Sequence, residues 1–277
     1  MKSLALPLLV LTALRVPAAP LEGVDLKLLA DTSVIQAAQP FTVGLHIHHH
    51  EGYHTYWRNP GIVGVPTSIV WTLPEGFHAG PIQWPAPEKV DMAGHPAHGY
   101  QRDVLLMVEI TPPSNLDDDG ITLTAAINWM ACANTCHPGQ TTLSLPVGKT
   151  APSAEVQALF SKAKEELPPP LRDWTATVLS PPDAPLIKIR LASQTPQTLT
   201  EEGSYFFSSD AQVSSDRPQS LTELSPGKYL LSLERSEYGP RGATSLPGVL
   251  SLSSPTAPTR FFSINPPVPD QSTDSNP

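Results

Sequence analysis

Cysteine, charge and aromatic side chains are all scarce in this sequence. Only two of its 277 residues are cysteine, 16% are charged and 6% are aromatic. Two cysteines exclude a disulfide-rich scaffold, and a formal net charge of −9 argues against nucleic acid as a partner. The sequence also lacks a Gly-rich phosphate loop, a zinc-protease helix motif and a serine-nucleophile elbow, so no common nucleotide-binding or hydrolytic site is indicated.

Long apolar runs are missing beyond the N-terminus. No later stretch approaches the roughly 18 apolar residues that a membrane span needs, so we expect a protein that does not span the membrane. The N-terminus combines Lys2, an apolar run over residues 3–14 and small residues before position 19, which predicts a signal peptide of residues 1–18. We therefore expect a periplasmic or secreted protein in an oxidising compartment.

Proline, in contrast, is abundant at 33 residues. Short alternating apolar runs separated by turn signals predict an all-β fold of two immunoglobulin-like β-sandwich domains, joined by a short helix and a Pro-rich linker. Ser153 can cap that helix, and Pro168–Pro170 ends it. We expect the first domain over residues 19–150, the helix and linker over 151–170, a second β-sandwich-like domain over 171–264 and a disordered tail over 265–277.

Both cysteines lie within the stretch Trp129–Gln140, as Cys132 and Cys136. Strand-like runs on either side predict two adjacent strands whose connection carries the pair. A disulfide closing so small a ring stabilises a chain by only about 2 kcal/mol, against nearly 5 for a loop of about a hundred residues. The spacing therefore favours a reversible redox pair over a staple, while a structural disulfide and a metal site remain alternatives. His137 follows directly, and a neighbouring imidazole can favour the thiolate.

Three further segments are candidates for a site. The strand-like run Phe41–His50 places His46, His48 and His50 on one face, which suits either a transition metal or a solvated polar surface. Aromatic residues in Gly52–Gly61 lead into an Asn-Pro-Gly turn, and they form either a packed strand end or a wall beside the cysteines. Asp91–Tyr100 is rich in Gly, Pro and His, which predicts a loop acting as a mobile flap or a connector.

An ordered set of motifs resembles the N-terminal periplasmic region of the DsbD/ScsB thiol:disulfide interchange proteins, with the ScsB branch closer. The motifs are Gly52–Gly61, Pro66–Thr67 with Trp71–Pro74, Gln83–Pro85, Gly99–Tyr100, and Cys132-x-x-x-Cys136 with Pro138. The resemblance covers about residues 25–147 and continues weakly at Tyr205–Phe207 and Leu246–Leu250. Members of the family usually continue into a transmembrane electron conduit and a thioredoxin-like domain, and this chain stops before either.

The resemblance implies a redox site without a metal or a cofactor beyond the disulfide itself. Cys132 and Cys136 would be the redox pair, with Cys136 forming the mixed disulfide. Tyr53 and Tyr56 would line the site, His98 and Tyr100 would sit in a cap over it, and His137 would adjoin it.

The implied function is a periplasmic thiol:disulfide interchange module, in a context of cytochrome c biogenesis or copper tolerance. Its partners would be a membrane-embedded thiol reductant upstream and a periplasmic thiol-disulfide protein downstream. Such a module is a carrier as much as an enzyme, of the protein thiol-disulfide oxidoreductase type. The alternative is a secreted two-domain β-sandwich binding protein whose disulfide is purely structural.

Overall fold

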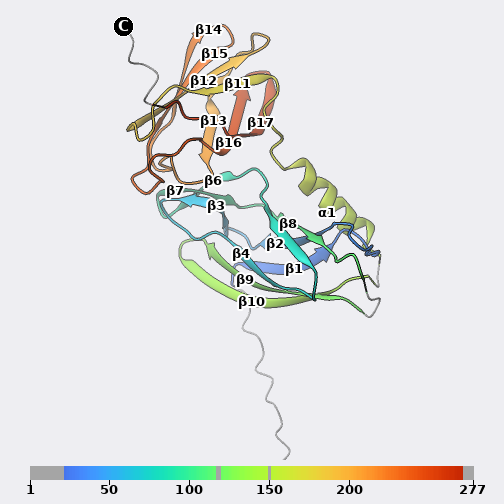
Figure 1. Cartoon of the computed structure of the whole chain (residues 1–277). Helices are drawn as coiled ribbons and strands as arrows, with labels where there is room; N and C mark the ends of the chain where they lie inside the picture. Colours follow the sequence, from blue (N-terminus) through green and yellow to red (C-terminus); the bar gives the residue numbers. More distant parts are fainter. Residues whose placement is uncertain (1–21, 117–119, 149–150, 271–277) are drawn as a thin grey trace, which may run out of the picture.

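The computed structural model describes residues 22–116, 120–148 and 151–270, so the predicted signal peptide lies outside the described residues. This part of the chain contains seventeen strands and one helix, arranged in antiparallel sheets (Figure 1). The predicted all-β fold is confirmed. The strands form two β-sandwiches, with a small three-stranded sheet between them (Figure 1).

The first sandwich packs a four-stranded sheet against a three-stranded sheet. The four-stranded sheet has the order β1 (Val24–Ala30), β2 (Phe41–His49), β8 (Val104–Thr111), β5 (His78–Gln83). The three-stranded sheet has the order β10 (Cys136–Pro146), β9 (Thr122–Cys132), β4 (Ser68–Thr72). Alternate residues of β2, among them Val43, Leu45 and Ile47, are buried in the core between the sheets, as their spacing predicts.

The helix α1 (Ala154–Glu165) covers the outer face of the four-stranded sheet. Ser153 Oγ caps it by accepting a hydrogen bond from the backbone N–H of Val156 at 3.3 Å. Phe160 and Ala163 are buried against Leu105 and Met107, which point outward from β8. Leu105 and Met107 therefore belong to a second apolar layer, separate from the sandwich core.

The small middle sheet has the order β3 (Thr55–Gly61), β7 (His95–Tyr100), β6 (Glu88–Met92). Two predictions fail here. The expected loop at 91–100 is mostly a β-hairpin, because Ala93 and Gly94 both adopt positive φ and make the two-residue turn that joins antiparallel strands. The expected Asn-Pro-Gly turn lies within β3, whose pairing with β7 shifts register between Tyr56 and Gly61.

The second sandwich is built from residues 174–264. One sheet has the order β11 (Trp174–Val178), β12 (Leu186–Ser193), β15 (Lys228–Glu234), β14 (Ser220–Ser225). The other has the order β13 (Thr200–Ser208), β16 (Gly248–Ser254), β17 (Ala257–Ile264). The sequence did not predict β14, because its residues are almost all exposed and show no apolar alternation.

The segments that join and follow the sandwiches are packed against them. In the predicted linker, the carbonyl of Pro169 accepts a hydrogen bond from the N–H of Ser263 at 2.9 Å. In the predicted disordered tail, the N–H of Val268 donates to the carbonyl of Thr244 at 2.9 Å, and its side chain packs on the second core. The tail prediction therefore fails for residues 265–270, and residues 271–277 lie outside the described part.

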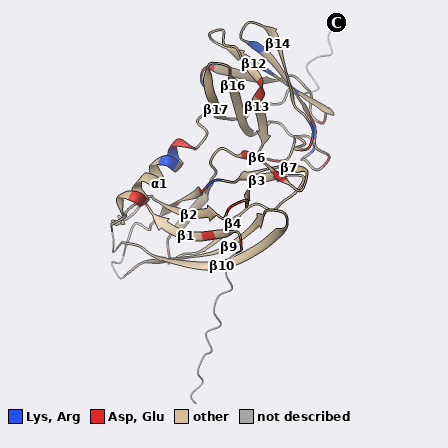
Figure 2. Cartoon of the chain, turned by 180° about the vertical axis from the view of Figure 1, so that it is seen from behind, with Lys and Arg blue, Asp and Glu red and all other residues tan. Residues whose placement is uncertain are grey.

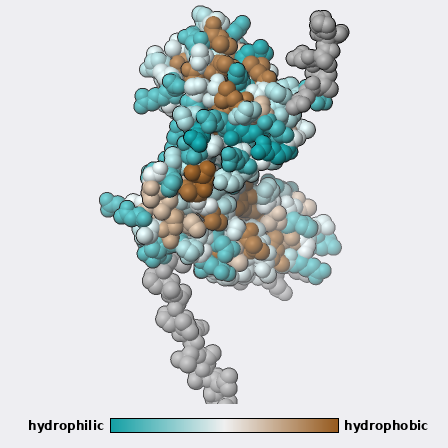
Figure 3. Space-filling view, turned by 90° about the vertical axis from the view of Figure 1, so that its left-hand side faces the viewer, coloured by the Kyte–Doolittle hydropathy of each residue, from teal (hydrophilic) through white to brown (hydrophobic). Residues whose placement is uncertain are grey.

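The two sandwiches share apolar contacts. Tyr205, Phe207 and Val249 of the second sandwich belong to the same buried cluster as Trp57 and Tyr100 of the first half. The space-filling view shows two lobes with small, separate hydrophobic patches on a largely hydrophilic surface (Figure 3). Charged residues are few and scattered over both sandwiches (Figure 2).

Candidate redox site

The two cysteines lie opposite each other at the end of the β9–β10 hairpin. The strands pair in register from Pro146 with Thr122 up to Cys136 with Cys132. Cys132 and Cys136 are joined by a disulfide, and their Cα atoms are 4.1 Å apart. The prediction of a cysteine pair between two strands is confirmed, with both cysteines at strand ends. The two strands are also joined along their whole length by backbone register pairs, independently of the disulfide.

The two cysteines differ in exposure. Cys132 is fully buried, and its backbone exchanges two hydrogen bonds with His54, at 2.9 and 3.0 Å. Cys136 is half-buried, beside the exposed residues Asn134 and Thr135 of the turn. An incoming thiol can therefore approach Cys136 more easily than Cys132.

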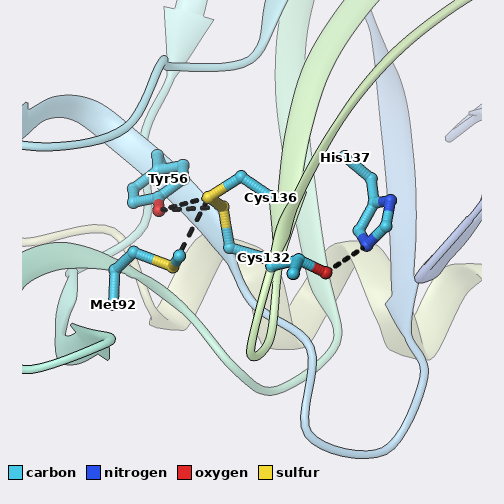
Figure 4. Close-up of a disulfide and its surroundings, with 6 residues drawn as sticks. Tyr56, Met92, Cys132, Cys136 and His137 are labelled. Atoms are coloured by element: carbon cyan, nitrogen blue, oxygen red, sulfur yellow. Dashed lines mark hydrogen bonds between the residues drawn. A yellow bond between two sulfur atoms is a disulfide. The ribbon is translucent and has the colours of Figure 1, made fainter.

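Tyr56 is the predicted lining residue that contacts the sulfurs. Its hydroxyl donates a hydrogen bond to Cys132 Sγ at 3.0 Å and lies 3.9 Å from Cys136 Sγ (Figure 4). Burial raises the pKa of Tyr56, so the hydroxyl keeps its proton at neutral pH. A Cβ on Gly64 would lie 2.3 Å from a carbon of the Tyr56 ring, so only glycine lets the loop pass this closely.

A β-hairpin covers the disulfide. We call it the cap hairpin; it comprises β6, the turn at Ala93–Gly94 and β7, residues Glu88–Tyr100. Met92 places its Sδ 3.4 Å from Cys136 Sγ (Figure 4), while Val90 and Ala97 are buried in one cluster with Cys132. The sequence analysis did not identify Met92. The two-residue turn that follows it was the available signal, because such a turn implies a strand ending at Met92.

Tyr53 and His137 lie near each other but away from the sulfurs. Their ring centroids are 6.1 Å apart, and Nδ1 of His137 lies 3.2 Å from a carboxylate oxygen of Glu22. The other ring nitrogen of His137 is 2.8 Å from Thr135 Oγ1. Figure 4 shows the His137 ring on the far side of the hairpin from the disulfide. Side chains of adjacent residues in a strand point to opposite faces. Because His137 directly follows Cys136, its side chain points away from the face that carries the disulfide.

The remaining predicted lining residues, His98 and Tyr100, belong to the cap hairpin but point elsewhere. The Tyr100 hydroxyl donates to the carbonyl of Pro85 at 2.9 Å. His98 Nε2 lies 3.2 Å from the hydroxyl of Tyr205, in the second sandwich. The structure thus brings Cys132, Cys136 and Tyr56 together and adds Met92.

The histidine row formed by His46 and His48 of β2 and by His50, just after β2, is paired with carboxylates. Asp103 lies 3.7 Å from His46 and 2.9 Å from His48, and Asp25 lies 3.3 Å from His50. Within the described residues, no group of three or more His, Cys, Asp or Glu side chains is arranged to hold a metal ion.

The comparisons place the disulfide in a known type of domain. Residues 26–148 match the family model for the thiol:disulfide interchange protein DsbD, N-terminal region. This part of the chain resembles the DsbD/ScsB N-terminal domain. The crystal structure of the N-terminal periplasmic domain of ScsB from Proteus mirabilis aligns with a TM-score of 0.62 at 17% identity, over 88% of this chain and 94% of that chain. A search of curated proteins finds no match.

The range matched by the DsbD family model contains the disulfide and the two side chains, described above, whose polar atoms lie closest to its sulfurs. Cys132, Cys136, Tyr56 and Met92 all fall inside the matched range. The structural similarity extends beyond it, because the aligned share of the chain is large enough to include the second sandwich. No helix in the described part of the chain is long and apolar enough to cross a membrane.

Proposed function

We propose that this protein is a periplasmic thiol:disulfide interchange module that passes electrons through the Cys132–Cys136 pair by mixed-disulfide exchange. The observation that carries the proposal is the asymmetry of the pair: Cys132 is buried and hydrogen-bonded to Tyr56, while Cys136 is half-buried at the hairpin end. This asymmetry suits an exchange in which one sulfur meets the partner and the other resolves the intermediate. The DsbD/ScsB resemblance supports the same function.

In the exchange, the reduced pair gives two electrons to an oxidised partner. The Cys136 thiolate attacks one sulfur of the partner's disulfide, forming a mixed disulfide and releasing the partner's other sulfur as a thiolate that takes up a proton. Cys132 loses its proton and attacks Cys136 Sγ. The Cys132–Cys136 bond forms, the mixed disulfide breaks, and the partner leaves as a dithiol. In the oxidised pair the Tyr56 hydroxyl donates to Cys132 Sγ, so it lies beside the sulfur that resolves the intermediate.

The oxidised pair must then be recharged by a dithiol. A thiolate of the upstream reductant attacks Cys136 Sγ, and Cys132 leaves as a thiolate that accepts a hydrogen bond from Tyr56. The second upstream thiol resolves this mixed disulfide. The family resemblance favours a membrane-embedded reductant upstream and a periplasmic thiol-disulfide protein downstream. The predicted signal peptide agrees with this location.

The alternative is a binding protein with a structural disulfide. The β9–β10 ladder argues against it, because eleven register pairs already fix the two strands and the bond closes a ring of very few residues. Such a ring gives only about 2 kcal/mol of stabilisation by the chain-entropy estimate.

Single-cysteine variants test the proposed function. Cys132→Ser leaves the half-buried thiol, and Cys136→Ser leaves the buried one as a matched control. Each is mixed with a defined oxidised thioredoxin-like periplasmic protein, quenched with acid and analysed by non-reducing gel and mass. We expect a stable one-to-one mixed disulfide with Cys132→Ser and at least tenfold less with Cys136→Ser. Equal, negligible adducts from both variants would support the structural alternative.

A further inference from the structure

The cap hairpin has a second face, which the disulfide does not use. Side chains alternate between the two faces of a strand, so neighbours on β6 and β7 point in opposite directions. Val90, Met92 and Ala97 belong to the apolar cluster around the disulfide. Lys89 and His98, which are register partners, contact the second sandwich instead. The cap hairpin therefore lies between the disulfide and the second sandwich.

Aromatic residues of β13 pack against this back face. The Lys89 ammonium lies 3.8 Å from the ring centroid of Tyr205, and the Tyr205 hydroxyl lies 3.2 Å from His98 Nε2. The ring centroids of His98 and Phe207 are 4.9 Å apart. His98 is only 3% exposed. Moving the cap hairpin away from the second sandwich would hydrate these rings and break the hydrogen bond, which opposes opening.

Ser215 adds a polar tie from the segment between β13 and β14. Its hydroxyl donates to the carbonyl of Pro96 at 3.2 Å and accepts from the N–H of Ile62 at 3.0 Å. Pro96 belongs to the cap hairpin, and Ile62 begins the loop that reaches Tyr56 at Gly64. One hydroxyl of the second sandwich therefore holds both segments that enclose the sulfurs.

We propose that Tyr205 and Ser215 are positioning residues for thiol exchange. They hold the cap hairpin closed from behind, and so they set how readily an incoming thiol reaches Cys136 Sγ under Met92. This inference rests on the proposed function only because it takes thiol exchange as the reaction. Access of a thiol to Cys136 Sγ is itself a property of the fold. It gives a role to the second sandwich, which has no cysteine and no histidine from residue 171 onward.

The test compares rates of disulfide reduction in the full mature chain. Oxidised protein is mixed with excess reduced glutathione, quenched with acid at intervals, alkylated and weighed. The double variant Tyr205→Phe/Ser215→Ala keeps the aromatic packing and removes the hydrogen bonds to the cap hairpin. An ordinary hydrogen bond changes an equilibrium by about fivefold. We therefore expect reduction to be about five to twenty times faster, with an unchanged midpoint potential.

Ser180→Ala is the matched control. Ser180 also lies in the second sandwich, donates to the carbonyl of Leu186 and accepts from the N–H of Lys188, both at 2.8 Å. Neither of these hydrogen bonds involves the cap hairpin. The rate of disulfide reduction in Ser180→Ala should therefore stay within about twofold of the rate in the unaltered protein. Met92→Ala removes the side chain in contact with Cys136 directly, and we expect it to accelerate reduction as well.

Several results would overturn the inference. The inference is wrong if the disulfide of the double variant is reduced no faster than that of Ser180→Ala. It is also wrong if the disulfide of Met92→Ala is reduced at the rate of the unaltered protein, because the cap hairpin would then not limit access to Cys136. If the double variant melts early, Tyr205→Phe alone is followed by amide hydrogen exchange. Faster exchange at Val90 and Ala97, with Ile189 of the second core unchanged, supports the inference; unchanged exchange refutes it. The midpoint potential tests the proposed function separately from these rates.

Discussion

Replacing Tyr56 by Phe removes one hydroxyl and leaves the ring that packs beside the disulfide. The hydroxyl donates to Cys132 Sγ at 3.0 Å, and burial holds the pKa of Tyr56 above its usual value, so it is a donor in both redox states. A disulfide sulfur is a weak acceptor, whereas the thiolate of the reduced pair carries a full negative charge, and the Tyr56 hydroxyl also lies 3.9 Å from Cys136 Sγ, the proposed thiolate sulfur. The hydrogen bond therefore stabilises the reduced pair more than the oxidised pair.

The size of this effect follows from the charge on the acceptor. Hydrogen bonds to charged groups contribute about 1.5–3 kcal/mol. For a two-electron couple about 1.4 kcal/mol corresponds to 30 mV. Tyr56→Phe should therefore make the midpoint potential about 30–60 mV more negative, because the reduced state loses the larger stabilisation.

The assay is equilibration of the purified protein in a series of thiol/disulfide buffers, followed by acid quenching and alkylation. Tyr53→Phe is the matched control, because Tyr53 faces His50 and His137 rather than the sulfurs, and we expect no shift. A shift below about 10 mV for Tyr56→Phe, or a shift to a more positive potential, would refute the reasoning.

Two further predictions concern stability. Burial lowers the pKa of His98 and of His49 to about 4, so the unfolded state binds more protons between pH 4 and 6.5. The free energy of unfolding should fall by about 2 kcal/mol for each histidine between pH 7 and pH 5. Urea titrations that give the same free energy of unfolding at both pH values would contradict this. Gly64→Ala adds a Cβ 2.3 Å from the Tyr56 ring, whereas at Gly52, also at positive φ, a Cβ meets nothing within 4 Å. Urea unfolding should show Gly64→Ala to be about 1–3 kcal/mol more destabilising than Gly52→Ala, and equal losses would refute the contact argument.

The sequence was sufficient where local patterns decide the structure. Alternation places Val43, Leu45 and Ile47 in the core, and the cysteine pair lies where two strands meet. The resemblance added Tyr56, which contacts the sulfur as expected. These features depend on short stretches of chain whose geometry is fixed by strand alternation and turns.

The sequence was insufficient where segments far apart in the chain meet. Met92 reaches Cys136 only because the Ala93–Gly94 turn folds β6 back along β7, and the high Gly and Pro content of that segment suggested a loop instead. His137 was expected beside the sulfurs from adjacency, and strand alternation turns it away. The contact between His98 and Tyr205 joins residues more than a hundred positions apart, which no local pattern encodes.

The reduction potential of the Cys132–Cys136 bond in the purified mature protein tests the central claim most directly. Equilibration across a thiol/disulfide buffer series, with alkylation and mass measurement, gives the fraction reduced at each potential. An exchange module requires a midpoint on the order of −180 to −270 mV, the range of proteins that pass electrons between thiols. A midpoint below about −300 mV is typical of structural disulfides and would contradict the proposed function.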